Sequence, residues 1–278
     1  MIVSSALPRE VTSRLVEWSL LPDGALVTTH SSWLLPVRQA SEPAMLKVAR
    51  IPDERAGYRL MSWWNGSGAA KTLAASDSAL LMERAAGPRS LAAMARSGHD
   101  AEACRVLCRT AAKLHAPSAP PWPELHRLDA WFQPLFDLSP SHSVLEPAAR
   151  QARLLLDDQR DVRPLHGDLH HDNVLDFVDR GWLAIDPHGL VGERTFDFAN
   201  IFTNPDLGDP SHPVATLPGR LEARLGVVAE ETGIEAVRIL DWIVAWTGLS
   251  AAWFIGDGDH ASAQIDLQIN ALALALRG

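Results

Sequence analysis

The sequence has few cysteines, no excess of basic charge and no apolar run long enough to cross a bilayer. Its two cysteines, Cys104 and Cys108, are spaced i,i+4 in a chain of 278 residues. This argues against a disulfide framework and fits a reducing, cytoplasmic compartment. The formal charge of −9 disfavours a nucleic-acid partner, because phosphate binding needs clustered Lys and Arg. The longest apolar stretch, residues 242–255, is shorter than the ~20 residues that span a bilayer, so we expect a buried helix and no membrane association.

Signals for secretion and for repeat architectures are also missing. The first residues, with Pro8 and Glu10, show no basic region leading into an apolar run, so we expect no signal peptide. No internal repeat, low-complexity tract or long linker interrupts the sequence. A chain of this length that is 47% hydrophobic can bury a substantial core, and it favours one large domain or two lobes that share a cleft.

The order of predicted elements indicates an α+β fold with two lobes. Turn signals and alternating apolar residues predict strands at 25–29, 33–37, 44–49, 71–75 and 78–83. One helix is expected at 54–64, with Asp53 as a candidate cap. Helical periodicity then predicts helices at 100–115, 128–138, 146–160, 217–232, 235–255 and 261–276, interrupted by short strands at 162–165, 174–177 and 182–185. We therefore expect a small antiparallel-sheet lobe at 1–85 and a larger, mainly helical lobe at 86–278.

One polar motif carries most of the chemical information. Residues 166–173 read HGDLHHDN, which places Asp168 and Asn173 five positions apart (173 − 168). This is the offset of the kinase catalytic loop, where the Asp faces the attacking hydroxyl and the Asn binds magnesium. Asp186 follows Asp168 by eighteen residues (186 − 168), at the end of a predicted buried strand. A second metal-binding carboxylate would lie there, since Mg²⁺ prefers oxygen ligands.

These motifs resemble the aminoglycoside phosphotransferase family, and within it the branch of streptomycin 6-phosphotransferases and hydroxyurea kinases. The stretches that carry the resemblance are LHGDLHHDN at 165–173, GWLAIDP at 181–187, GLVGE at 189–193, LSAAW at 249–253 and WWNGSG at 63–68. The resemblance covers most of the chain. It implies a two-lobed protein-kinase-like fold and transfer of phosphate from ATP, with Mg²⁺, to a hydroxyl of a small molecule. An aminoglycoside such as streptomycin is the first expectation, and hydroxyurea or another small hydroxylated metabolite is the alternative.

The nucleotide side of the site is expected in the small lobe. Lys47 has apolar neighbours in its strand, and the resemblance implies that it contacts the α and β phosphates and pairs with Glu54. The sequence has no Gly-rich phosphate loop, so Ser31 and Ser32 are candidates to cover the nucleotide, although an ordinary hairpin connection is equally compatible. The adenine is expected at the backbone of residues 82–85, which include Glu83 and Ala85.

The acceptor side is expected in the large lobe. Asp168 would orient the acceptor hydroxyl and accept its proton, and Asn173 and Asp186 would hold the magnesium ion. The acidic candidates for a cationic substrate are Glu193, Asp197 and Asp257. Two of them have structural alternatives, since Asp197 could brace the catalytic loop and Asp257 could belong to a helix–helix turn.

Two other function classes compete with the kinase hypothesis. His166, Asp168, His170, His171, Asp172, Asp186 and His188 could form a metal cluster of the kind that a zinc-dependent hydrolase uses. Such a hydrolase would leave Lys47 and the Asp168–Asn173 spacing without a role. A nucleotide-binding pseudokinase would lack a catalytic group, whereas Lys47, Asp168, Asn173 and Asp186 are all present.

Overall fold

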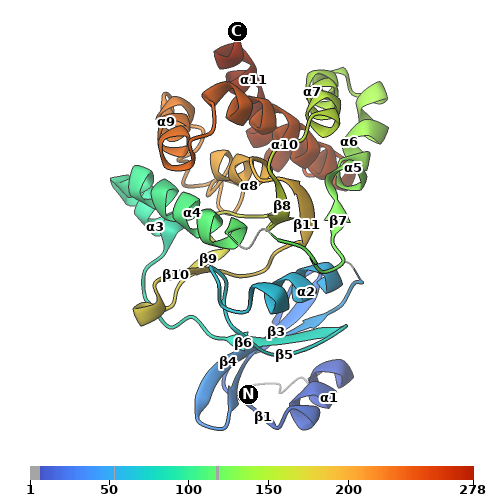
Figure 1. The fold of residues 1–278 in the computed structure, drawn as a ribbon, viewed down its shortest axis with the longest axis vertical. Coiled ribbons are helices and arrows are strands. Elements are labelled where there is room, and N and C mark those ends of the chain that lie inside the picture. The colour runs from blue at the N-terminus through green and yellow to red at the C-terminus, as the bar shows by residue number, and fades with distance from the viewer. Residues whose placement is uncertain (1–6, 53, 117–118) are drawn as a thin grey trace.

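An antiparallel sheet forms the N-terminal part of the protein in the computed structural model (Figure 1). The structure describes residues 7–52, 54–116 and 119–278, so the predicted cap Asp53 lies outside the described residues. The strands are β1 (Leu20–Pro22), β2 (Val27–Thr28), β3 (Ser32–Gln39), β4 (Glu42–Ala49), β5 (Thr72–Ser76) and β6 (Ala79–Glu83). They are ordered β1-β3-β4-β6-β5, and β2 pairs with β3.

Two helices cover opposite faces of this sheet. Helix α1 (Arg9–Glu17) buries Val11 against Leu46 and Val48, which point to one face of β4. Helix α2 (Glu54–Trp64) packs on the other side, between the sheet and the rest of the molecule (Figure 1). The prediction of α2 is confirmed, but α1 is a second helix that the sequence analysis did not expect.

The C-terminal part is mainly helical. Its helices are α3 (Leu91–Met94), α4 (Asp100–His115), α5 (Leu128–Trp131), α6 (Gln133–Leu138), α7 (Glu146–Asp157), α8 (Phe196–Ala199), α9 (Arg220–Thr232), α10 (Ala236–Asp257) and α11 (His260–Arg277). A π segment, η1 (Ala95–His99), joins α3 to α4, and short 3-10 segments are η2 (Ser139–Ser141), η3 (Ser143–Leu145), η4 (Val178–Arg180) and η5 (Asn200–Phe202). The predicted kinase-like arrangement of a sheet-containing part and a helical part is therefore confirmed (Figure 1).

Short strands hold the polar motif between the two parts. They are β7 (His126–Arg127), β8 (Val162–Leu165), β9 (Val174–Asp176), β10 (Trp182–Ala184) and β11 (Leu190–Glu193). Strands β9 and β10 form an antiparallel pair, and β11 lies between β7 and β8. The segment that contains Asp168 therefore connects β8 to β9, and the segment that contains Asp186 connects β10 to β11.

Most predicted helices of this part are confirmed, with shifted ends. The helix expected at 128–138 is divided into α5 and α6 at Phe132, and α6 has a proline in its first turn. Helix α10 extends beyond the apolar stretch at 242–255 and is, within the described residues, the one helix long and apolar enough to cross a membrane, but 78% of its most apolar window is buried inside the fold. Trp242 and Ile243 are fully buried on it, so α10 is a core helix, as expected from its sequence.

Helix α2 touches the segment that follows Asp186. A Cβ on Gly57 would come within 2.0 Å of the Pro187 carbonyl oxygen. Only glycine permits this approach of the backbones. The contact sets α2, and with it Glu54, directly against the Asp186 segment.

Candidate active site

Lys47 reaches the site because side chains alternate between the two faces of β4. Leu46 and Val48 belong to the cluster on the α1 face, which leaves Lys47 on the opposite face, where it is 2% exposed. Its Nζ lies 2.5 Å from Glu54 Oε2 and also forms an ion pair with Asp186 Oδ1. The ion pair with Glu54 that the resemblance implied is thus present, and a buried charge has the opposite charges that it requires.

The backbone of the catalytic-loop motif is held by one buried carboxylate. Asp197 accepts hydrogen bonds from the amides of His166 (2.9 Å) and Gly167 (2.8 Å), and it lies 2.8 Å from His115 Nε2. Gly167 has φ +85°, and a Cβ there would meet Leu190 Cδ1 at 2.8 Å, so both conformation and space require glycine. His166 Nε2 lies 2.8 Å from the Ile185 carbonyl oxygen, which ties this loop to the segment before Asp186.

Both carboxylate oxygens of Asp168 are bound by side-chain amides. Asn173 Nδ2 donates to Oδ2 (2.8 Å) and also to the Asp168 carbonyl oxygen (2.8 Å). Asn200 Nδ2 donates to Oδ1 (2.5 Å). Four lone-pair positions are available on a carboxylate, so these bonds fix its orientation and leave acceptor capacity for a hydroxyl.

Histidines surround Asp168 and favour its ionised form. Burial alone would raise the pKa of Asp168, but the charges of His170, His188 and His166 outweigh it and hold this pKa well below its usual range. Burial likewise opposes the charged form of His170, yet the Asp168 carboxylate, 3.5 Å away, raises the pKa of His170 above its ordinary value. Asp168 is therefore an anion at neutral pH, able to accept a hydrogen bond from an alcohol.

The residues expected to hold magnesium have suitable donors. Asp186 has φ +61°, a left-handed conformation that is rare for a non-glycine residue and is typical of functional sites. Its carboxylate is 44% exposed. The amide nitrogen of Asn173 is committed to Asp168, which leaves its oxygen as the available group. A carboxylate and an amide oxygen are the donors that Mg²⁺ prefers, so the residues fit this ion.

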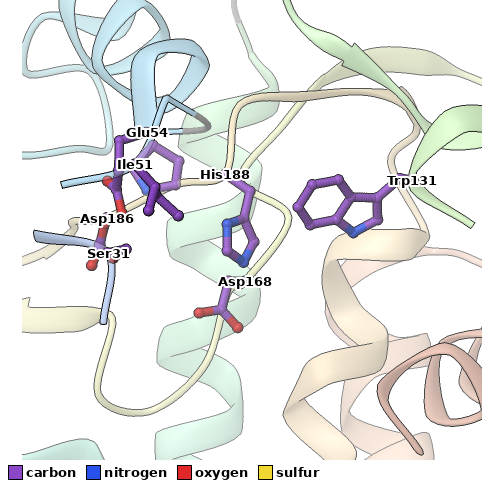
Figure 2. A pocket seen from close by; sticks show the side chains of 8 residues that line it. Ser31, Ile51, Glu54, Trp131, Asp168, Asp186 and His188 are labelled. Carbon is purple, nitrogen blue, oxygen red and sulfur yellow. The ribbon is translucent and has the colours of Figure 1, made fainter. Parts of the chain in front are cut away.

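Two cavities meet at Asp168 and His188. One, of about 310 Å³, is lined by Ser31, Ile51, Glu54, Trp131, Asp168, Asp186, Pro187 and His188. The other, of about 350 Å³, is lined by Asp168, His170, His188, Asn200, Asn204, Leu207, Gly208, Trp246, Ser250, Trp253 and Phe254. Figure 2 shows the first: the His188 ring lies above the Asp168 carboxylate, with Trp131 to one side and Ser31, Glu54 and Asp186 on the other. Asp168 therefore stands where two binding sites could share a reacting group.

The remaining candidates for the nucleotide site lie in different environments. Ser31 lines the first cavity. Ser32 is fully buried at the start of β3 and does not line it. Glu83 uses its side chain to accept from the Lys71 amide (2.5 Å) and to pair with Arg180, and its own amide donates to the Lys71 carbonyl oxygen (3.0 Å). Among the described residues, the Ala85 amide has no hydrogen-bond partner.

The three acidic candidates for the substrate do not line either cavity at Asp168. Glu193 is 1% exposed and pairs with Arg238, so its charge is already compensated. Asp197 braces the catalytic loop, the structural alternative weighed for it. Asp257 is exposed at the C-terminal end of α10. None of the three presents a free carboxylate to an acceptor beside Asp168.

The histidine and carboxylate cluster required by a zinc hydrolase does not form among the described residues, where no group of three or more His, Cys, Asp or Glu side chains could hold a metal ion. His166 is engaged with Ile185, and His171 is 1% exposed. Neither ring nitrogen of His171 has a partner in the described part of the chain. The geometry gives these histidines scaffold positions.

The sequence analysis missed Asn200 and the aromatic residues around His188. Trp131 packs against His188 with ring centroids 5.0 Å apart and against Trp253 at 5.6 Å. The available signal for Asn200 was its position three residues after Asp197, which places both side chains on one face of a helical turn. That face points to the catalytic loop.

Known proteins with this sequence pattern are kinases of small molecules. The model of the aminoglycoside/hydroxyurea antibiotic resistance kinase family matches residues 17–258. Streptomycin 3''-kinase of Klebsiella pneumoniae is 67% identical over 261 residues, with 93% of this chain and 98% of the relative covered. Streptomycin 6-kinase of Streptomyces glaucescens is 31% identical over 290 residues, with 99% and 90% covered.

Solved structures show the same fold at low sequence identity. A thermostable mutant of aminoglycoside phosphotransferase APH(4)-Ia, in a ternary complex with ADP and hygromycin B, has a TM-score of 0.68 and 13% identity, with 96% of this chain and 98% of that chain covered. An ethanolamine kinase of Plasmodium vivax has a TM-score of 0.65 and 13% identity, with 92% and 82% covered. Fold, motif and sequence agree: the chain belongs to the aminoglycoside/hydroxyurea antibiotic resistance kinase family.

Proposed function

We propose that this protein is an ATP- and Mg²⁺-dependent phosphotransferase that inactivates streptomycin by phosphorylating its 3''-hydroxyl. The observation that carries the proposal is the Asp168 carboxylate, held by two amides at the junction of two cavities, one of which also contains Asp186 and Glu54. The 67% identity to a streptomycin 3''-kinase, against 31% to a streptomycin 6-kinase, supports this acceptor position over the 6-hydroxyl suggested by the sequence resemblance. The cytoplasm, which contains ATP, is the compartment we propose.

The nucleotide would bind between the two lobes, which we propose to divide near residue 85. Lys47 is the buried cation that we propose for the phosphates, because it pairs with Glu54 and Asp186, which line the first cavity. Ser31 lines the same cavity. The Ala85 amide lacks a partner among the described residues. It is therefore available to donate a hydrogen bond to the adenine edge, and main-chain groups of this kind recognise the base without dependence on side chains.

Asp168 would position the acceptor hydroxyl. Phosphoryl transfer passes through a loose transition state in which the protein mainly positions the reactants and stabilises charge. A carboxylate with a lowered pKa is a weak base, and it suits a reaction in which the hydroxyl proton leaves late. Asn173 and Asp186 would hold magnesium, which when bound neutralises charge on the ATP phosphates. Asp168 then receives the proton at its carboxylate.

The acceptor would occupy the cavity on the other side of Asp168. Trp246, Trp253 and Phe254 form an aromatic wall along α10, and Asn200, Asn204 and Ser250 supply polar groups. Streptomycin carries guanidinium groups, and a guanidinium packs favourably on an indole face. An aromatic and amide-lined cavity suits this acceptor better than it suits a small, uncharged alcohol.

A coupled assay of ADP release, with streptomycin as acceptor, tests the proposal. We expect turnover that requires both ATP and Mg²⁺, and a product whose phosphorus couples to the proton on C3'' in two-dimensional NMR. Asp168→Ala should abolish turnover while it retains ATP binding. A product phosphorylated at the 6 position would overturn the regiochemical proposal. Turnover with hydroxyurea or a small amino alcohol, and none with streptomycin, would overturn the acceptor.

A further inference from the structure

A turn of asparagines lies directly beside the proposed catalytic carboxylate. Asn200 Nδ2 is 2.5 Å from Asp168 Oδ1, and Asn200 Oδ1 accepts from Asn204 Nδ2 at 2.8 Å. Both asparagines line the second cavity together with Asp168. They are 3% and 4% exposed, so their amides have little water to replace a lost hydrogen bond.

We propose that Asn200 is a positioning residue for phosphoryl transfer and that Asn204 sets the orientation of its amide. The inference rests on the proposed role of Asp168. An Asn amide has a donor end and an acceptor end. Because Asn204 donates to the oxygen of Asn200, the nitrogen of Asn200 must point to Asp168. The carboxylate is then held from the acceptor side by Asn200 and from the metal side by Asn173.

The backbone of this turn is held by the arginine of a buried ion pair. Arg224 of α9 is 1% exposed and forms an ion pair with Asp100 of α4 at 2.6 Å. The same guanidinium donates to the carbonyl oxygens of Ile201 (2.5 Å) and Asn204 (2.7 Å). An arginine fork with several acceptors is a rigid support. It fixes the backbone on which Asn200 and Asn204 stand.

The neighbouring Asp197 shows that the turn acts on the loop in two ways. Asp197 holds the backbone amides of His166 and Gly167, whereas Asn200, three residues later, holds the side chain of Asp168. Asp197 thus places the loop, and Asn200 sets the rotation of the carboxylate within it. A misplaced carboxylate should lower kcat without a change in the affinity for the nucleotide, because the proposed nucleotide contacts lie in the other cavity.

The test compares kcat and KM in Asn200→Ala, Asn200→Asp and Asn204→Ala with streptomycin and ATP. Asn200→Asp keeps the shape but replaces the donor with a second anion. We expect kcat to fall roughly tenfold to a hundredfold in both Asn200 variants, the range for loss of a hydrogen bond to a charged group. In Asn204→Ala, kcat should fall roughly threefold to tenfold, the range for loss of a neutral hydrogen bond. The KM for ATP should remain within about twofold throughout.

Asn270 provides the matched control. It is also 4% exposed, and its Nδ2 donates to the Val244 carbonyl oxygen and to Thr247 Oγ1, both at 2.8 Å. Asn270→Ala should lower the melting temperature but leave kcat unchanged in the folded protein, which separates stability from positioning. Wild-type kcat in folded Asn200→Ala and Asn200→Asp would overturn the inference, as would failure of both Asn200→Ala and Asn204→Ala to fold. If the wild type itself does not phosphorylate streptomycin, the proposed function fails instead.

Discussion

Lys47 on β4 and Asp186 on the segment after β10 form an ion pair between residues 139 positions apart. The lysine is buried and the aspartate is 44% exposed, and Asp186 also lines the first cavity, where we propose that the nucleotide binds. This relationship joins the sheet to the catalytic segment.

Replacement of Lys47 by Ala should lower kcat/KM for ATP by about a hundredfold or more, the scale for loss of one preorganised charge contact in an active site. Lys47→Arg should not restore activity, because a planar guanidinium does not fit a site made for a compact ammonium. Steady-state kinetics with varied ATP measures both effects. Lys113→Ala, an exposed lysine on α4, is the control and should behave as the wild type.

Asp197→Asn should destabilise the protein by about 2–4 kcal/mol, because one amide end would face a backbone N–H that needs an acceptor. The loop would also lose its support, so we expect kcat to fall more than tenfold in the protein that remains folded. Urea unfolding and turnover measure the two effects. Asp77→Asn, whose side chain is 80% exposed, should change stability by less than about 0.5 kcal/mol. A similarly small change in Asp197→Asn would contradict the bracing role.

Trp253→Ala should raise the KM for streptomycin roughly threefold to thirtyfold, the range for loss of one cation–π contact, with little effect on the KM for ATP. Trp253→Phe keeps an aromatic face, so its KM for streptomycin should rise less. Initial rates at varied streptomycin give the comparison. Trp18→Ala, at the end of α1 and remote from both cavities, is the control. An unchanged KM for streptomycin in Trp253→Ala would place the acceptor elsewhere.

The sequence was most informative for features that depend on residues close together along the chain. Asp168 and Asn173 are five positions apart in one loop, so their spacing indicated that they belong to one site, and the structure adds the hydrogen bond between them. Lys47 was identified because a lysine among apolar strand residues needs a partner of opposite charge, and Glu54 is near it in sequence. Helix α4 was predicted with its observed bounds because its apolar periodicity and acidic first turn agree.

Long-range partners explain what the sequence analysis missed. Glu193 was a reasonable substrate carboxylate until Arg238, 45 positions later, was found against it. Asn200 acquires its role from Asp168, 32 positions earlier, and its spacing from Asp197 indicates a shared helical face but not this contact. For both residues the deciding contact is tertiary. Helix α1 is a different case, because Leu7, Val11, Leu15 and Trp18 pack into one cluster and are spaced as on one helical face, a local signal that was overlooked.

Asp266 provides a test of stability against pH. Its side chain on α11 is fully buried, and neither carboxylate oxygen has a hydrogen-bond partner among the described residues. Burial raises the pKa of Asp266 well above its ordinary value of 3.8, although Ser250 opposes the shift. Above pH 3.8 the unfolded chain releases this proton while the folded protein retains it. Stability contributed by this group therefore falls as pH rises, until the folded pKa is passed.

Asp266→Asn removes the titrating group and should be more stable than the wild type at neutral pH. The difference in the free energy of unfolding should grow with pH above about 4, by up to about 1.4 kcal/mol for each pH unit, and then level off. Urea unfolding of both proteins at pH 5, 6, 7 and 8 measures it, and the contributions of other groups cancel in the difference. Asp257→Asn, exposed on α10, is the control and should give a small, constant difference. A constant difference for Asp266→Asn as well would mean that Asp266 is ionised in the folded protein and has a partner that compensates its charge.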